Sequence, residues 1–321
     1  MTKQDLSNLR FISEDGRFSY YQMKSGKLFL SLNYQISEVL SYPEGSQYEV
    51  LGSNTKEFLL VTVAPKFHQH LSPRKNKKIF IVPYGMSEPN FLGDGSFPRF
   101  QLNSTWASYY DSLGGVIYYK NLITPAVSFF IDLNNPLSKY FVPETVMLTK
   151  DKILFTDVNK DGNQGLLIFD RTTKKPRVIY KLASNSQKLE LCQFEGKTYI
   201  GEFNLTTSKR SSKIYRLEHD KGYRKVILKN IYSSKKEDIG NMVCNIDEKS
   251  LYFVKDYSNA TEMIFDVAKL NLETMSVERM TEMKKVFQFV QMDKRLLIPY
   301  QGEYFVVKGE ANNKTNDNLK K

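Results

Sequence analysis

The chain lacks the residues that small disulfide-rich folds and cysteine-based zinc domains require. Its 321 residues include only two cysteines, Cys192 and Cys244, and a single tryptophan. Two thiols are too few for a disulfide-stapled scaffold or for a zinc site built from cysteines. Neither class of protein is therefore compatible with this sequence.

Long apolar runs are also missing. No stretch approaches the roughly 20 consecutive apolar residues that a membrane helix needs, so we expect no transmembrane segment. The first ten residues, MTKQDLSNLR, lack the apolar segment of a signal peptide. The expected location is periplasmic or in the cell envelope if a leader has been removed, and cytoplasmic otherwise.

Common catalytic signatures are absent as well. The sequence has no G-x-S-x-G elbow, no P-loop and no dinucleotide-binding fingerprint. Aromatic residues, by contrast, are abundant, with 20 Tyr and 21 Phe. Because aromatic and β-branched residues favour strands and helical periodicity is weak along the whole chain, we expect an all-β protein.

A strand–turn–strand unit recurs seven times. Each unit has two apolar strands joined by a short turn of Asp, Asn, Gly or Lys, which is the chemistry of a tight hairpin. The units lie at 10–22, 48–63, 106–121, 144–157, 189–203, 242–256 and 287–300. A third strand and often a weaker fourth follow, and the units are spaced by about 45 residues, as in four-stranded propeller blades.

This spacing predicts a β-propeller with seven four-stranded blades, or six if one hairpin is irregular. The segment 91–105 is where such an irregularity would lie. We expect one propeller domain over residues 1–309 and a disordered basic and polar tail over 310–321. The segment before Leu9 is a candidate to complete the last blade and close the ring, which would remove exposed sheet edges.

Two units carry a family resemblance. The segments LRFISEDGRFSYYQ (9–22) and ILFTDVNKDGNQGLLIFDRTTKK (153–175) resemble the hairpins of TolB-type, or WD40-like, propeller repeats. The other five units share the strand–turn–strand pattern but not the residue identities. The resemblance implies a propeller used for protein interaction, often in the bacterial envelope, and it implies no chemistry.

The turn at 157–163 raises the question of calcium. Asp157, Asn159 and Asp161 alternate as oxygen donors and Gly162 follows, but position 12 of an EF-hand loop would be Ile168 rather than Glu. EF-hand geometry is therefore excluded. A looser structural calcium site at these three residues stays open beside the reading as a hairpin turn, and no other cofactor is expected.

The basic residues point to a docking face. The chain carries 46 Lys and Arg against 35 Asp and Glu, a formal charge of +11. Three basic runs fall in predicted loops between second and third strands, and such loops share one face of a propeller, where their charges add. The predicted partner-binding residues are Lys24, Lys27, Arg74, Lys75, Lys77, Lys78, Lys209, Arg210 and Lys213.

We therefore expect a non-catalytic binding or scaffold protein that docks a protein with an acidic surface on this face. An anionic membrane or polymer is the other possible surface. We do not expect nucleic acid as the partner, because the aromatic residues lie in strands rather than among the basic loops. The alternative is a hydrolase or lyase acting on a polymer at the central channel, where Glu190, Asn245 and Gln288 are candidate lining residues.

The two cysteines occupy equivalent positions, three residues before the hairpin turn, in consecutive first strands. A disulfide needs Cα atoms 4.4–6.8 Å apart, which such positions rarely reach. We expect two buried thiols that pack between blades.

Overall fold

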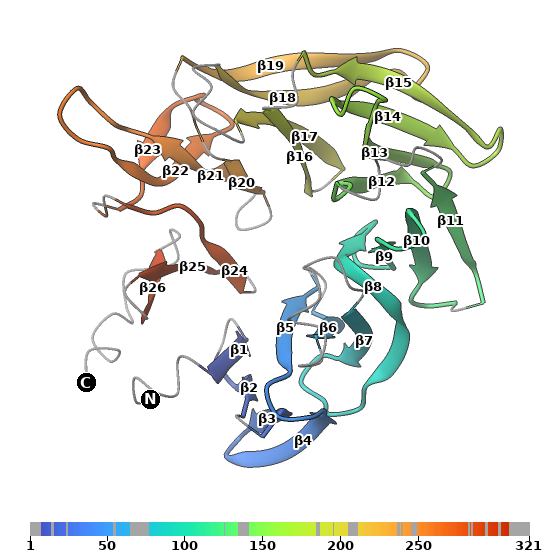
Figure 1. Cartoon of the computed structure of the whole chain (residues 1–321), viewed down its shortest axis with the longest axis vertical. Helices are drawn as coiled ribbons and strands as arrows, with labels where there is room; N and C mark the ends of the chain where they lie inside the picture. The colour runs from blue at the N-terminus through green and yellow to red at the C-terminus, as the bar shows by residue number, and fades with distance from the viewer. Residues whose placement is uncertain are drawn as a thin grey trace.

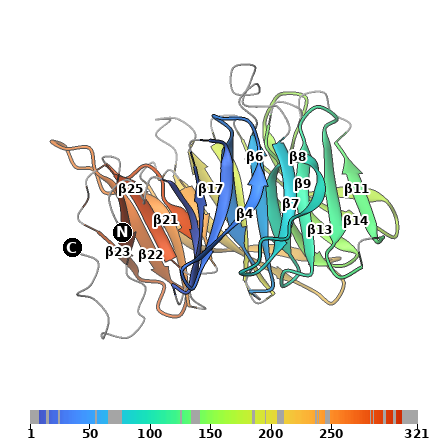
Figure 2. The same ribbon diagram turned by 90° about the horizontal axis from the view of Figure 1, so that it is seen from below.

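The computed structural model describes residues 8–13, 16–23, 25–53, 56–64, 77–124, 126–133, 141–183, 187–194, 196–204, 211–235, 238, 240–244, 249–281, 283, 285–292, 295–300 and 303–307. These residues form antiparallel sheets arranged in a ring (Figure 1). From the side, the strands run across the thickness of this ring (Figure 2). Within the described part of the chain, no helix has the length and apolar character that crossing a membrane would require.

The first three blades contain eleven strands. Blade 1 has β1 (Leu9–Ile12), β2 (Phe18–Gln22), β3 (Lys27–Leu32) and β4 (Gln35–Ser41). Blade 2 begins with β5 (Gln47–Gly52), β6 (Phe58–Ala64) and β7 (Lys77–Pro83), and blade 3 ends with β9 (Trp106–Asp111), β10 (Val116–Asn121) and β11 (Ser128–Asp132). Between them, β8 (Asn90–Gln101) belongs to both blades.

The remaining strands form four further blades. Blade 4 has β12 (Thr145–Thr149), β13 (Lys152–Val158), β14 (Gln164–Asp170) and β15 (Lys175–Lys181), and blade 5 has β16 (Gln187–Phe194), β17 (Lys197–Asn204), β18 (Ser212–His219) and β19 (Val226–Ser234). Blade 6 has β20 (Gly240–Val243), β21 (Ser250–Asp256), β22 (Phe265–Asn271) and β23 (Val277–Arg279). Blade 7 has three described strands, β24 (Val290–Met292), β25 (Arg295–Tyr300) and β26 (Glu303–Val307).

The described strands therefore form seven blades, and the prediction of an all-β propeller is confirmed. Blade 7 lies between blade 6 and blade 1 in the ring (Figure 1). The segment before Leu9 and the tail 310–321 lie outside the described residues, apart from residue 8. Completion of the last blade by the N-terminal segment stays a prediction.

One hairpin was assigned to the wrong place in its blade. The unit 106–121 was expected to supply the first and second strands, but it forms β9 and β10, the second and third strands of blade 3. The segment 91–105, where an irregularity was expected, is mostly β8, whose first half pairs with β7 and whose second half pairs with β9. Blades 2 and 3 are thus joined by a continuous strand.

The hydrophobic core lies between neighbouring blades. In the described residues, each of six buried clusters is built from two consecutive blades, as where Phe11 and Tyr20 of blade 1 pack with Tyr48 and Val61 of blade 2. Fully burying such a side chain stabilises the fold by about 1.5–3 kcal/mol. The many large Tyr and Phe side chains therefore help to fill the space between neighbouring blades.

Candidate functional site

A cavity of about 440 Å³ occupies the centre of the ring. Its walls come from the first strands of blades 2 to 6, namely β5, the second half of β8, β12, β16 and the end of β20. Apolar and polar groups share the lining surface about equally, and Arg99 and Glu49 are its charged side chains. A concave pocket that combines apolar walls with placed polar groups is the usual form of a ligand site.

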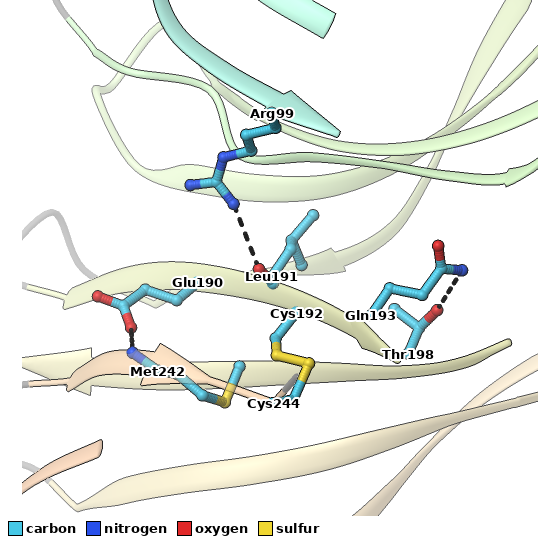
Figure 3. The surroundings of a disulfide bond; sticks show 8 residues. All are labelled: Arg99, Glu190, Leu191, Cys192, Gln193, Thr198, Met242 and Cys244. Carbon is cyan, nitrogen blue, oxygen red and sulfur yellow. Dashed lines mark hydrogen bonds between the residues drawn. A yellow bond between two sulfur atoms is a disulfide. The ribbon is translucent and has the colours of Figure 1, made fainter. Parts of the chain in front are cut away.

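Arg99 reaches from blade 3 to blades 4 and 5. Its Nη2 lies 2.5 Å from Oε2 of Glu144, the residue before β12, and its Nη1 donates to the carbonyl oxygen of Leu191 in β16 at 3.4 Å. Figure 3 shows the guanidinium directed toward β16. Three first strands that are distant in sequence are therefore joined through one side chain.

Glu144 is held in a poorly solvated position. Burial raises the pKa of this carboxyl above its usual range, and the neighbouring Arg99 opposes that shift by favouring the ionised form. The folded protein therefore binds a proton at Glu144 more tightly than the unfolded chain does. Its contribution to stability falls as pH rises from the ordinary value through the raised pKa.

We expect Glu144→Gln to remove this fall in stability. Urea unfolding between about pH 4 and pH 7 should give a flatter dependence of the unfolding free energy on pH than the wild type shows. Glu273→Gln, on an exposed turn of blade 6, is the matched control. Equal slopes for Glu144→Gln and the wild type would contradict the assignment.

Glu190 has a structural role. Its Oε1 accepts the N–H of Asn241 at 3.0 Å, its Oε2 accepts the N–H of Met242 at 2.7 Å, and Lys188 lies 2.5 Å from Oε1. Gly240, at φ +96°, allows this approach, since a Cβ there would lie 2.9 Å from Oε1 of Glu190. The carboxylate therefore fastens blade 5 to blade 6.

Of the other residues proposed to line an enzymatic channel, Gln288 is exposed just before β24 and is not part of the cavity lining. Asn245 lies outside the described residues. No group of three or more His, Cys, Asp or Glu residues suited to a metal ion occurs in the part of the chain that the structure describes. Local sequence contained no signal for Arg99 and Glu144, because their proximity depends on the ring.

The expectation of two buried thiols was wrong. Cys192 of β16 and Cys244, directly after β20, form a disulfide with Cα atoms 6.0 Å apart (Figure 3). Equivalent positions in neighbouring blades can come this close because the first strands converge around the channel. Both cysteines are nearly buried and line the cavity, so the disulfide is part of its wall.

The turn 157–163 uses its oxygens locally. Oδ1 of Asn159 accepts the N–H groups of Asp161 at 2.9 Å and Asn163 at 3.0 Å, and Oδ1 of Asp157 accepts the N–H of Val158 at 2.7 Å. These bonds form the Asx-type turn that joins β13 to β14. Calcium at Asp157, Asn159 and Asp161 stays a prediction.

Four of the nine predicted docking residues lie in described positions. Lys27 begins β3, Lys77 and Lys78 begin β7, and Lys213 is the second residue of β18. All four stand where a third strand begins, and these strand ends share one face of the ring. Lys24, Arg74, Lys75, Lys209 and Arg210 lie outside the described residues.

Three of these lysines already contact carboxylates. Lys27 lies 2.6 Å from Glu38, Lys77 lies 2.8 Å from Glu49, and Lys78 lies 3.2 Å from Asp94. Their side chains keep between 29% and 42% of their surface exposed. Such solvent-exposed pairs contribute only about 0–1 kcal/mol each, so another carboxylate can replace the internal one at little cost.

Comparisons with known proteins agree with the ring. The sequence matches no protein-family model and no curated protein. The structure is similar to an uncharacterized protein of Listeria monocytogenes (TM-score 0.58, 12% identity, 94% of each chain) and to the β-propeller domain of Myceliophteria thermophila Cps50 (Swd1) (TM-score 0.56, 11% identity, 94% of this chain and 95% of that one).

It is also similar to a prolyl endopeptidase, with a TM-score of 0.54 and 11% identity over 95% of this chain and 51% of the other. The chain thus spans about half the length of that enzyme. At these identities the comparisons show the fold alone. The protein is a β-propeller, and the narrower resemblance to TolB-type repeats stays a prediction.

Proposed function

We propose that the chain is a non-catalytic binding protein whose docking surface is the face on which the third strands begin. The partner is a protein with an acidic surface. The observation that carries the proposal is the common position of Lys27, Lys77, Lys78 and Lys213 at the starts of β3, β7 and β18. Cations grouped on one face attract acidic partners and speed their association.

The state of the channel favours binding over catalysis. Both oxygens of Glu190 accept backbone N–H groups, and Glu144 is paired with Arg99. A general acid or base must reach the proton that it transfers. These two carboxylates instead hold neighbouring blades together, which supports a binding role over an enzymatic one.

The proposed setting is an oxidising compartment such as the periplasm or cell envelope. The Cys192–Cys244 disulfide supports this setting, because disulfides persist in oxidising compartments and are rare in the cytosol. The sequence resemblance of 9–22 and 153–175 to TolB-type repeats points in the same direction.

The docking face can be tested with paired charge reversals. A fluorescent ten-residue polyglutamate peptide serves as the acidic probe, and its binding is followed by fluorescence anisotropy at low and raised salt. We expect Lys77→Glu with Lys78→Glu to weaken binding by about tenfold or more and to reduce its salt dependence. Both residues are at the start of β7 and are partly exposed, so folding should tolerate the change.

The matched control reverses two lysines on the opposite face. Lys175 begins β15 and Lys221 lies in the turn between β18 and β19, so both stand at third-to-fourth-strand connections. Lys175→Glu with Lys221→Glu changes the net charge equally and should alter binding much less. Equal weakening by the two double variants would show that only net charge matters and would refute a specific face.

A further inference from the structure

The central cavity combines a cation, aromatic side chains and unusual backbone geometry. Four non-glycine residues of its lining have positive φ angles: Phe97 at 53°, Leu102 at 45°, Asn103 at 51° and Ser104 at 66°. Bulky residues such as Phe and Leu rarely adopt this region. Such conformations concentrate at ligand sites, where the surrounding structure holds them.

The aromatic part of the lining is accessible. Phe97 lines the cavity and keeps 50% of its surface exposed, and Phe100 and Phe194 are half-buried in the same lining. Three phenyl rings around a cavity of about 440 Å³ suit an apolar group of a few carbon atoms or one aromatic ring. The body of a matching ligand is therefore apolar.

The hydrogen-bond donors of Arg99 decide the polar end of that ligand. The two charges of the lining are each offset by a partner, since Glu49 is paired with Lys77 at 2.8 Å and Arg99 with Glu144 at 2.5 Å. Arg99 uses one nitrogen for Glu144 and another for the carbonyl oxygen of Leu191. A guanidinium has five N–H donors, which leaves it donors beyond these two contacts. A carboxylate is the anion that such a planar fork binds in bidentate geometry.

We propose that the central cavity is a binding site for a carboxylate attached to an apolar or aromatic group, with Arg99 binding the carboxylate and Phe97 contacting the apolar part. The ligand can be a small organic acid or the carboxyl end of a peptide, because both present the same chemistry. This site goes beyond the docking face. The lysines proposed for docking are not part of the cavity lining, and one of them, Lys77, contacts the lining residue Glu49.

The test compares three probes on the whole protein. N-Acetylphenylalanine represents a peptide carboxyl end, 3-phenylpropanoate represents a small acid, and N-acetylphenylalanine amide has the same body without the charge. Dissociation constants come from ligand-observed NMR titration. We expect at least one acid to bind and the amide to bind about tenfold more weakly or worse, because it lacks a charge-assisted contact with Arg99.

Protein variants assign the contacts. Arg99→Lys keeps the charge but loses the fork, and should weaken acid binding by about tenfold. Arg171→Lys is the control, since Arg171 also lies against aromatic rings, those of Trp106 and Phe129, but is not part of the cavity lining. Because Arg99 also supports Glu144, Phe97→Ala provides a variant at a half-exposed position, and it should weaken the acid and the amide alike.

Comparing the two acids identifies the source of the ligand, and comparing acid with amide tests whether the site exists. Tighter binding of N-acetylphenylalanine than of 3-phenylpropanoate supports a peptide carboxyl end, and the reverse order supports a small acid. Equal affinity for acid and amide, or no binding of either acid to folded protein at millimolar concentration, overturns the proposal. The two results that would overturn the proposal do not test the docking face, which is tested separately by polyglutamate binding.

Discussion

Replacing both Cys192 and Cys244 with alanine is expected to lower the free energy of unfolding by about 4 kcal/mol at 25 °C. The disulfide closes a loop with a sequence separation of 52 residues, and it joins the first strands of blades 5 and 6 beside the channel. In the chain-entropy description, a crosslink stabilises by removing conformations from the unfolded ensemble. Urea denaturation of the double variant and of the oxidised wild type measures the difference.

Reduction of the wild type with a dithiol supplies the control, because it breaks the same bond without changing side-chain volume. The reductant should destabilise the wild type and leave the double alanine variant unchanged. An unfolding free energy within about 1 kcal/mol of the oxidised wild type would contradict a stabilising disulfide. Protein isolated from its natural source should resist thiol alkylation, and labelling of both cysteines would contradict an oxidising setting.

The repeat could be predicted from the sequence because each hairpin has its own local sequence pattern. Apolar strands separated by turns of Asp, Asn, Gly or Lys need no knowledge of distant residues, and the hairpins β1–β2, β5–β6 and β16–β17 form where this pattern predicts them. The segment 265–279, where helical periodicity is as weak as in the rest of the chain, forms β22, a turn and β23.

The error in blade 3 has an identifiable cause. The run FLGDGSF at 91–97 has the composition of a loop, but Gly93 and Gly95 lie within β8. A Cβ on Gly93 would lie 2.3 Å from Oη of Tyr109, and a Cβ on Gly95 would lie 2.5 Å from Cδ2 of the same residue. These glycines therefore make room for the Tyr109 ring on the strand, a contact that the local sequence does not reveal.

The candidate site could not be predicted in the same way. Arg99, Glu144 and Leu191 come from three blades, and each is an ordinary residue in its own segment. The disulfide was missed for the related reason that the distance between Cys192 and Cys244 depends on how closely the first strands converge. Repeated local patterns are enough to predict the blades. The contacts around the channel depend on how the blades close into a ring, and so the local sequence does not reveal them.

Arg279→Met should be among the most destabilising single substitutions, with an expected loss of about 3–5 kcal/mol. Arg279 ends β23, and its Nε donates to Oδ2 of Asp266 in β22 at 2.7 Å. Asp266 is fully buried, and its Oδ1 accepts the N–H of Val267 at 2.8 Å and the hydroxyl of Thr281. Removing the guanidinium would leave a buried carboxylate without its cation, which costs far more than the loss of a surface pair.

A second substitution tests that cause. Asp266→Asn removes the charge and keeps an oxygen that can accept from Val267 and Thr281, so the double variant Asp266→Asn with Arg279→Met should be more stable than Arg279→Met alone. Lys249→Met is the control in the same blade. Lys249 and Glu273 form a pair 3.1 Å apart, with more than 60% of each side chain exposed. Removing this pair should lower the free energy of unfolding by no more than about 1 kcal/mol. If urea unfolding places Arg279→Met within that same limit, the contact of Arg279 with the buried Asp266 does not stabilise blade 6. If Arg279→Met is strongly destabilising and Asp266→Asn relieves the loss, the cost comes from the unpaired charge of Asp266. It does not come from lost packing of the arginine stem.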